Sequence, residues 1–336
     1  MTSLPVKRPL ALDLTAAQFA ALPRGRHAIA YRDLFSPHAD LPTATRRWAD
    51  EQGFDLRALT LRSRERGARS QKVLFALRDG VAVESVLIRR HDGYTACISS
   101  QVGCAFACRF CASGQAGLKR NLSAGEIVEQ VVRLGPRVNR IVFMGIGEPL
   151  NNYENVLRAI RILRDRQGMD FPSSGITVST IGIPKGLKAL REEHLAINLT
   201  ISLHATTDES RAALIPGSRK HGVAEVVARA LSWAERHNRD VTFVYLVLPG
   251  LNDSRADLER LVAMFSGQRA RINLMRWNPV AGIRLGRTED RVLALFRERL
   301  VRAGIPVVVR DTQGRDISAA CGQLWLRDLN GRALAA

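Results

Sequence analysis

Residues 101–114 read QVGCAFACRFCASG and hold three cysteines, Cys104, Cys108 and Cys111, in the spacing C-x3-C-x2-C. A structural zinc site takes four protein ligands in a closed tetrahedron, yet the nearest histidine is His91. A 4Fe-4S cluster held by only three thiolates leaves one iron open to a further ligand. The stretch therefore favours a cluster with an open corner over structural zinc, a redox cysteine pair or buried core thiols.

Apolar, β-rich runs alternate with amphipathic helical segments from about residue 94 onward. This alternation is typical of parallel strands joined by crossover helices. The predicted strands are residues 95–100, 139–145, 176–181, 197–204, 241–248 and 271–277. The clearest helix opens with a capping box of Ser123 and Glu126. Six βα units predict an α/β fold, an incomplete (βα)6 TIM-like barrel with its chemistry at the carboxyl ends of the strands.

The first 90 or so residues follow a different pattern. The expected elements are helical segments at 15–22 and 43–52 and alternating runs at 71–79 and 81–90, joined by the turn Asp79-Gly80. We predict an accessory, RNA-binding domain over residues 1–92 that ends in a β-hairpin. A core barrel would follow over residues 93–312, and a carboxyl-terminal segment over residues 313–336 would carry Cys321.

The charge balance points to a polyanionic partner. Fifty basic residues stand against 32 acidic ones, a formal net charge of +18. Such a surplus favours encounter with nucleic acid, although a solvated, arginine-rich surface without function remains the alternative. A group of cations ahead of a predicted strand is suited to phosphate binding and comprises Arg62, Arg64, Arg66, Arg69 and Lys72.

Cysteine usage indicates the compartment. Five cysteines, three of them in one loop, do not resemble a disulfide framework, so a reducing compartment is expected. No apolar run reaches membrane-spanning length, and the opening residues MTSLPVKRPLALDL lack the apolar core of a signal peptide. We predict a cytoplasmic, monomeric protein without membrane contact.

A resemblance to a known family covers residues 82 to about 325. The motifs that carry it are ACISSQVGCAFACRFCASGQAGLKRNL (96–122), GEP (147–149), VSTIG (178–182), ISLHA (201–205), NLMRWNP (273–279) and DISAACGQL (316–324). Together they resemble the RlmN/Cfr family of radical S-adenosylmethionine (SAM) RNA methyltransferases, and GEP favours the RlmN branch. The resemblance implies a radical SAM barrel that methylates C2 of an adenine in 23S rRNA and possibly tRNA.

The same resemblance implies cofactor ligands. It assigns Cys104, Cys108 and Cys111 to a 4Fe-4S cluster. It assigns SAM contacts to Gly147, Glu148, Ser179, Ser202, Leu203, His204 and Asn278. These positions lie at or just past the ends of predicted strands, where a barrel carries its chemistry. Taken singly, each is explained as well by a turn, a cap or a buried hydrogen-bonded side chain.

Catalytic roles for Cys321, Cys97 and Glu84 also come from the resemblance. One SAM would methylate the sulfur of Cys321, and a radical from a second SAM would take a hydrogen from that methyl group. The resulting methylene radical adds to adenine C2, a carbon too electron-poor to attack SAM directly. With Glu84 as proton acceptor, attack by Cys97 would release the methylated base and leave a disulfide. The alternatives are buried apolar thiols and an outward-facing strand glutamate.

The chain departs from the family pattern in places. Val244 stands where the family usually has a glutamate, and Ile146 replaces a methionine, although we expect neither to touch the cluster or the thiols. Residues 1 to about 75 match only loosely, which leaves substrate choice open. Alternatives are Cfr-like methylation at C8, a paralogue with another substrate, and a non-catalytic, metal-stabilised RNA-binding protein. An electron donor such as flavodoxin or ferredoxin is a further expected partner.

Overall fold

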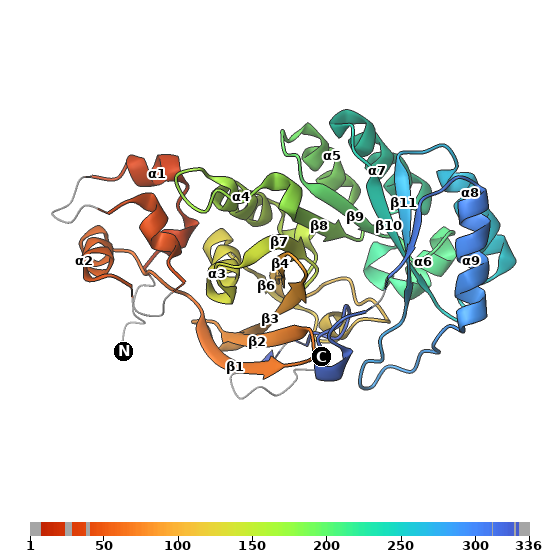
Figure 1. The fold of residues 1–336 in the computed structure, drawn as a ribbon, viewed down its shortest axis with the longest axis horizontal. Coiled ribbons are helices and arrows are strands. Elements are labelled where there is room, and N and C mark those ends of the chain that lie inside the picture. The colour runs from red at the N-terminus through yellow and green to blue at the C-terminus, as the bar shows by residue number, and fades with distance from the viewer. Residues whose placement is uncertain (1–7, 24–28, 38–40, 311, 326, 329–336) are drawn as a thin grey trace.

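A computed structural model describes residues 8–23, 29–37, 41–310, 312–325 and 327–328 (Figure 1). The strands are β1 (Thr60–Arg66), β2 (Ser70–Ala76), β3 (Val81–Arg90), β4 (Gly93–Cys97), β5 (Gln101–Gly103), β6 (Leu118–Asn121), β7 (Val138–Phe143), β8 (Ile176–Thr180), β9 (Asn198–Ser202), β10 (Val241–Val247), β11 (Ala270–Arg276), β12 (Val307–Val309) and β13 (Arg327–Asp328). The α-helices are α1 (Ala16–Ala20), α2 (Thr43–Gln52), α3 (Ala124–Leu134), α4 (Tyr153–Arg164), α5 (Pro184–Glu192), α6 (Asp208–Leu214), α7 (Val223–His237), α8 (Arg255–Phe265) and α9 (Asp290–Arg302).

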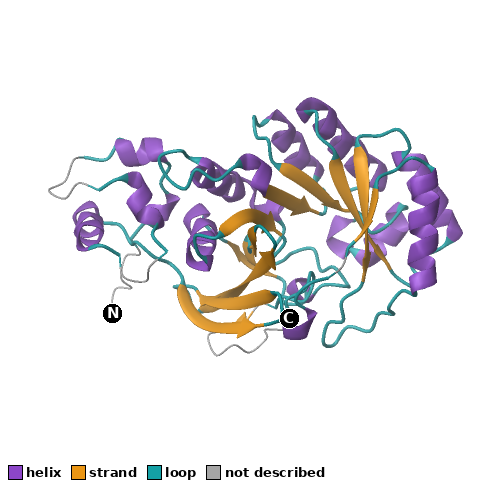
Figure 2. Ribbon diagram, viewed as in Figure 1, coloured by secondary structure: helices purple, strands orange, loops and turns teal. Residues whose placement is uncertain are grey.

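The barrel half of the sheet is parallel. It runs in the order β4-β7-β8-β9-β10-β11-β12, and each neighbouring pair is parallel. All six predicted barrel strands are present, and Figure 2 shows helices lying outside them. Among the described strands the order does not close on itself, so the prediction of an incomplete, TIM-like barrel is confirmed. The extra strand β12 was missed because three residues are too few to show a period.

The amino-terminal strands extend the same sheet. β2 and β3 form the predicted antiparallel hairpin, and β3 pairs antiparallel with the first barrel strand, β4. β1 pairs with β2 and was not predicted, since every one of its residues is exposed and no apolar alternation marks it. The cations Arg62, Arg64 and Arg66 therefore precede the predicted strand, as expected, and lie within an additional edge strand.

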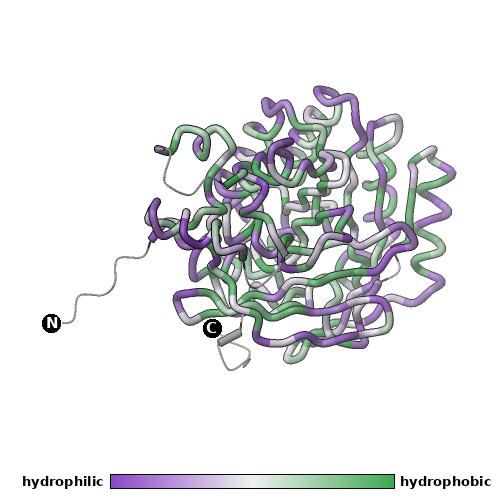
Figure 3. The backbone as a smooth tube through the Cα atoms, turned by 60° about the vertical axis from the view of Figure 1, so that its left-hand side comes forward, coloured by the Kyte–Doolittle hydropathy of each residue, from purple (hydrophilic) through white to green (hydrophobic). Residues whose placement is uncertain are grey.

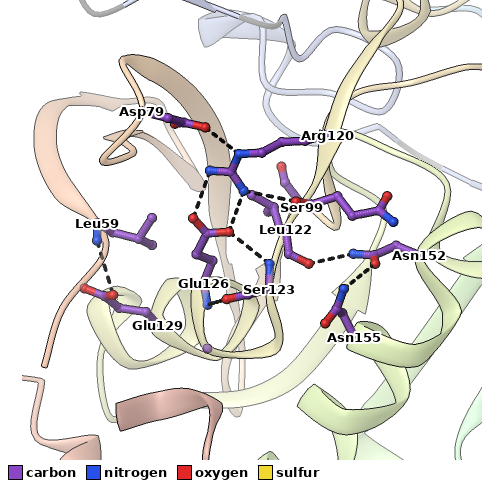
Figure 4. Close-up of polar contacts among 12 residues, drawn as sticks. Leu59, Asp79, Ser99, Arg120, Leu122, Ser123, Glu126, Glu129, Asn152 and Asn155 are labelled. Atoms are coloured by element: carbon purple, nitrogen blue, oxygen red, sulfur yellow. Dashed lines mark hydrogen bonds and ion pairs between the residues drawn. The ribbon is translucent and has the colours of Figure 1, made fainter. Parts of the chain in front are cut away.

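Polar contacts fasten the hairpin turn to the first barrel helix (Figure 4). Ser123 and Glu126 form the predicted capping box at the start of α3. Arg120 donates to both carboxylate oxygens of Glu126, at 2.7 and 2.9 Å, and to Asp79 in the hairpin turn at 2.5 Å. A forked, charge-assisted contact of this kind fixes orientation as well as distance.

A second contact fastens the chain before β1. The buried carboxylate of Glu129 on α3 accepts hydrogen bonds from the backbone N–H groups of Ala58, at 2.6 Å, and Leu59, at 3.2 Å (Figure 4). Its other oxygen, Oε1, has no hydrogen-bond partner in the described chain. Burial raises the pKa of Glu129 to about 7, because the charged form loses water that two N–H donors only partly replace.

The core between the sheet and the helices is mainly apolar. Figure 3 shows hydrophobic stretches gathered in the central strands and hydrophilic ones at the periphery. Trp233, Phe143, Phe243 and Tyr245 are among the fully buried side chains between sheet and helices. No helix in the described ranges is long and apolar enough to cross a membrane.

Glu129→Gln will change how stability depends on pH. The raised pKa means that Glu129 favours the folded state most below its unfolded value of 4.5 and loses that contribution as pH rises through about 7. Urea unfolding between pH 4.5 and 8 should show wild type losing about 3 kcal/mol relative to Glu129→Gln over this range. The exposed Glu154→Gln is the control, and parallel pH curves for wild type and Glu129→Gln would contradict the account.

Candidate active site

One cavity at the carboxyl ends of the parallel strands collects most of the predicted site residues. The members that line it are Cys104, Cys108, Cys111, Gly147, Glu148, Ser179, Ser202, His204, Asn278 and Cys321. They come from six separate parts of the sequence, which the barrel brings to one edge. Leu203, Glu84 and Cys97 do not line this cavity.

The three cysteines of the 104–111 loop face the cavity from one side. Burial raises the pKa of Cys104 to about 12 and raises that of Cys108 well above its ordinary value. Since a metal ligand must be a thiolate, a bound metal must supply the positive charge that water cannot. Among the described residues, no three His, Cys, Asp or Glu side chains surround a single metal position. A cluster binds each thiolate to a different iron, so this three-cysteine donor set fits it better than it fits zinc.

Gly147 lets the GEP segment approach the start of β5. Its φ is +106°, and an added Cβ would lie 2.6 Å from Cβ and 2.8 Å from the backbone nitrogen of Gln101. The side-chain oxygen of Gln101 in turn accepts the backbone N–H of Glu148 at 2.8 Å. Glycine is therefore required at position 147 because the backbone has a positive φ and because Gln101 leaves no room for a Cβ.

The Glu148 carboxylate is fixed from several directions. It accepts hydrogen bonds from the Thr180 hydroxyl at 2.5 Å, from the Ile181 N–H at 2.9 Å and from the Leu150 N–H at 3.0 Å. Burial nevertheless raises its pKa to about 7, against the effect of these donors. An ammonium group in the cavity would supply the missing positive charge and return the carboxyl to its ionised form.

The ISLHA motif contributes a neutral histidine. His204 has a positive φ of 57° and is buried, and its Nδ1 accepts the backbone N–H of Leu246 at 3.0 Å. Burial lowers its pKa to about 3, so the imidazole is uncharged at neutral pH. Because Nδ1 is an acceptor, the ring proton lies on Nε2. The side chain of Leu203 is fully buried in the core, which leaves only its backbone for a ligand contact.

Hydrogen bonds hold the carboxyl-terminal segment on the cysteine loop. The backbone oxygen of Gly322 accepts the N–H of Ala112 at 2.7 Å, and that of Leu324 accepts the Ser113 hydroxyl at 2.8 Å. Asn278 donates to the backbone oxygen of Cys321 at 3.1 Å. Asn278, predicted to contact SAM, therefore also positions Cys321.

Cys321 also borders a second cavity. Cys97, Arg90, Thr95 and Gln313 line this cavity, and Cys321, Met144, Met275 and Arg310 line both cavities. Both thiols are free. Burial, with a smaller effect from Cys321, raises the pKa of Cys97 to about 12, and Arg310 acts in the opposite direction. The two cysteines given catalytic roles thus share one chamber.

Glu84 is a buried residue of β3, so its interpretation as an outward-facing strand residue is wrong. Its Oε2 accepts the backbone N–H of Trp325 at 2.9 Å, and its Oε1 lies 3.9 Å from the ammonium of Lys72. Lys72 also donates to the backbone oxygen of Ile317 at 2.7 Å. Both side chains therefore hold the segment that carries Cys321, and Glu84 lines neither cavity.

Several site residues were missed at the level of sequence. Thr180, Arg310 and Trp277 line the first cavity, as does Val244, one of the two positions that depart from the family pattern. Thr180 and Trp277 lie inside the quoted VSTIG and NLMRWNP motifs, so a wider reading of those motifs would have found them. Arg310 follows the unpredicted β12, and no sequence signal marked it.

Gly147→Ala should destabilise the protein through the clash with Gln101 in addition to the unfavourable φ. Gly267→Ala is the control, because Gly267 also has a positive φ, +72°, but nothing lies within 4 Å of an added Cβ. Urea unfolding should show a loss of about 1–2 kcal/mol for Gly267→Ala and at least about 3 kcal/mol for Gly147→Ala. Equal losses would show that space beside Gln101 does not matter.

The chain resembles proteins of one family over most of its length. A profile of the radical SAM superfamily matches residues 98–262. A "Probable RNA methyltransferase" of Rhodopseudomonas palustris is 72% identical over 323 residues, which cover 96% of this chain and 90% of the relative. A "Dual-specificity RNA methyltransferase RlmN" of Syntrophobacter fumaroxidans is 44% identical over 282 residues, covering 82% of each chain.

A solved structure agrees with the sequence relatives. The crystal structure of a radical SAM methyltransferase from Sphaerobacter thermophilus is 36% identical, covers 94% of this chain and 99% of its own, and superposes with a TM-score of 0.86. Motifs, cavity residues and relatives all point in the same direction. The chain belongs to the RlmN-type radical SAM RNA methyltransferases.

Proposed function

We propose that this enzyme methylates C2 of an adenine in 23S rRNA, and in tRNA, through an S-methylcysteine on Cys321. The observation that carries the proposal is the position of Cys321 on the wall between two cavities. One cavity holds the three loop cysteines and Glu148, and the other holds Cys97. A methyl group on Cys321 could therefore be activated from one side and meet the base on the other.

The first cavity fits a 4Fe-4S cluster and SAM. Cys104, Cys108 and Cys111 would ligate three irons, and the cluster with bound SAM supplies one-electron cleavage of the SAM sulfonium. Glu148, a buried carboxylate, would accept hydrogen bonds from the amino N–H groups of SAM, whose nitrogen the open iron would hold. Ser179, Ser202, His204 and Asn278 offer further polar groups, and Leu203 its backbone. A low-potential donor such as flavodoxin or ferredoxin would supply the electron.

The chemistry of the chain itself rests on two thiols. Cys321 accepts a methyl group on sulfur, loses one hydrogen atom from it and bonds through the remaining methylene to adenine C2. The adduct radical would then lose one electron to the redox cofactor and the C2 proton to a base. Attack by the Cys97 thiolate on the Cys321 sulfur would form a disulfide and break the carbon–sulfur bond, and the released carbon would take up a proton to become the methyl group. With its pKa near 12, Cys97 must be activated, and Arg310 is the cation that favours its thiolate.

The second cavity suits a purine. Met144 and Met275 give apolar surface, while Arg90, Arg310 and Gln313 give hydrogen-bond donors. Glu84 would accept the C2 proton only after a rearrangement of the segment it holds, because it accepts the Trp325 N–H and lines neither cavity. The arginines of β1 offer an exposed basic edge for RNA phosphates.

Incubation of the reconstituted enzyme with SAM, a reductant and unmodified 23S rRNA or tRNA should yield 2-methyladenosine. Nucleoside mass spectrometry reads the product. 8-Methyladenosine alone would favour the Cfr-like alternative. Absence of any methylated adenine, together with one zinc and no iron or sulfide, would contradict the proposal and favour a non-catalytic RNA-binding protein.

Alanine variants separate the two thiols. Cys321→Ala should abolish S-methylation and product, because no sulfur remains to carry the methyl group. Cys97→Ala should trap a covalent protein–RNA adduct, visible as a slow band in a denaturing gel. Thr95→Val is the control, since it changes another lining residue of the second cavity on the same strand. Normal turnover in both cysteine variants would remove the proposed roles.

A further inference from the structure

Arg211 is a buried cation that neither the motifs nor the proposed chemistry uses. It lies on α6, and only 1% of it is exposed. Its Nη2 donates to the backbone oxygen of Ile181, its Nη1 to that of His221 at 3.1 Å, and its Nε has no hydrogen-bond partner among the described residues. A buried charge normally has a counter-charge, because desolvation is expensive. Here only neutral carbonyl groups receive its hydrogen bonds.

The end of α6 and the turn that follows it lie directly on the cysteine loop. The backbone N–H of Arg109 donates to the oxygen of Leu214 at 3.0 Å, and the N–H of Gly217 donates to the oxygen of Phe106 at 3.0 Å. These two bonds are made on either side of Cys108 in the sequence. An added Cβ at Gly217 would lie 2.7 Å from the Cα of Phe106, so the two backbones are in close contact. Arg211 precedes Leu214 by three residues and lies on the same face of the helix.

The backbone of Ile181 links Arg211 to the carboxylate of Glu148 in the first cavity. Ile181, whose oxygen accepts the Arg211 Nη2, donates its own N–H to Glu148 at 2.9 Å. Burial lowers the pKa of Arg211 to about 10, while Cys108, Asp208 and Glu148 all favour its charged form. The guanidinium is therefore still positive at neutral pH, between the cysteine loop and Glu148.

A cluster on this loop would bring further negative charge close to Arg211. A 4Fe-4S cluster together with its three thiolates carries a net negative charge before reduction. Reduction adds one electron to it and breaks no bond. A fixed cation in a poorly solvated interior stabilises the more negative state more strongly. We propose that Arg211 is a positioning residue whose buried charge raises the reduction potential of the cluster and so favours the one-electron step. This inference rests on the proposed function only in assuming that the cluster is there.

The test is a redox titration of the reconstituted holoenzyme, with dithionite as reductant, followed by the EPR signal of the reduced cluster without SAM or RNA. Arg211→Gln should lower the equilibrium constant for reduction at least tenfold, which is about 59 mV for a one-electron couple. The matched control is Arg109→Gln, which removes an exposed arginine next to Cys108. Solvent screens that charge, so its effect should stay below twofold.

Two further variants keep the test decisive. Arg211→Met removes the charge while leaving an apolar stem, and Arg211→Lys keeps the charge while losing the forked hydrogen bonds. We expect Arg211→Met to lower the equilibrium constant for reduction as much as Arg211→Gln does. For Arg211→Lys this constant should stay within threefold of the wild-type value. If only the wild type and Arg211→Lys retain a cluster, this result would support the need for a cation at position 211.

Equal shifts in Lys and Gln variants would overturn the inference, as would equal shifts in Arg211→Gln and Arg109→Gln. Loss of the cluster from the Lys, Gln and Met variants alike would also overturn it, since the hydrogen bonds and not the charge would then matter. Wild-type protein without iron or sulfide would instead contradict the proposed function. A wild type that methylates RNA beside an Arg211→Gln variant of unchanged potential would contradict only the role of Arg211.

Discussion

Burial of ionisable groups at the carboxyl edge of the parallel sheet is the constraint on which the site depends. Cys108, Glu148 and Arg211 are all removed from water there, and burial moves the pKa of each toward the neutral form. Such groups are stable as ions only beside partners of opposite charge. The edge of the barrel therefore favours ligands that bring positive charge into the interior.

The carboxyl-terminal segment lies against this edge and contributes to both cavities. It crosses from β12 to the cysteine loop, where Gly322 and Leu324 accept hydrogen bonds from Ala112 and Ser113. On its other side, the backbone N–H of Trp325 in this segment donates to the carboxylate of Glu84 in the amino-terminal hairpin. Parts of the chain more than 200 residues apart thus position one sulfur, Cys321, between two cavities. Changes in the hairpin should therefore affect chemistry without touching the loop cysteines.

Local patterns allowed much of this to be predicted. The six barrel strands and α3 follow from apolar runs and a capping box, and the cavity gathers most motif residues because parallel strands share a carboxyl edge. β1 escaped prediction because an exposed edge strand carries no apolar period. Arg211 and Arg310 escaped because their importance comes from tertiary neighbours. For the same reason the burial of Glu84 could not be decided from alternation alone.

The central claim is that three thiolates hold a cluster whose open iron binds the amino and carboxylate groups of SAM. Electron–nuclear double resonance of the reduced protein with SAM labelled by nitrogen-15 in its amino group tests this directly. The account predicts a hyperfine coupling between that nitrogen and the cluster, which requires a bond to iron. A cluster signal that is unchanged by SAM and free of nitrogen-15 coupling would contradict it.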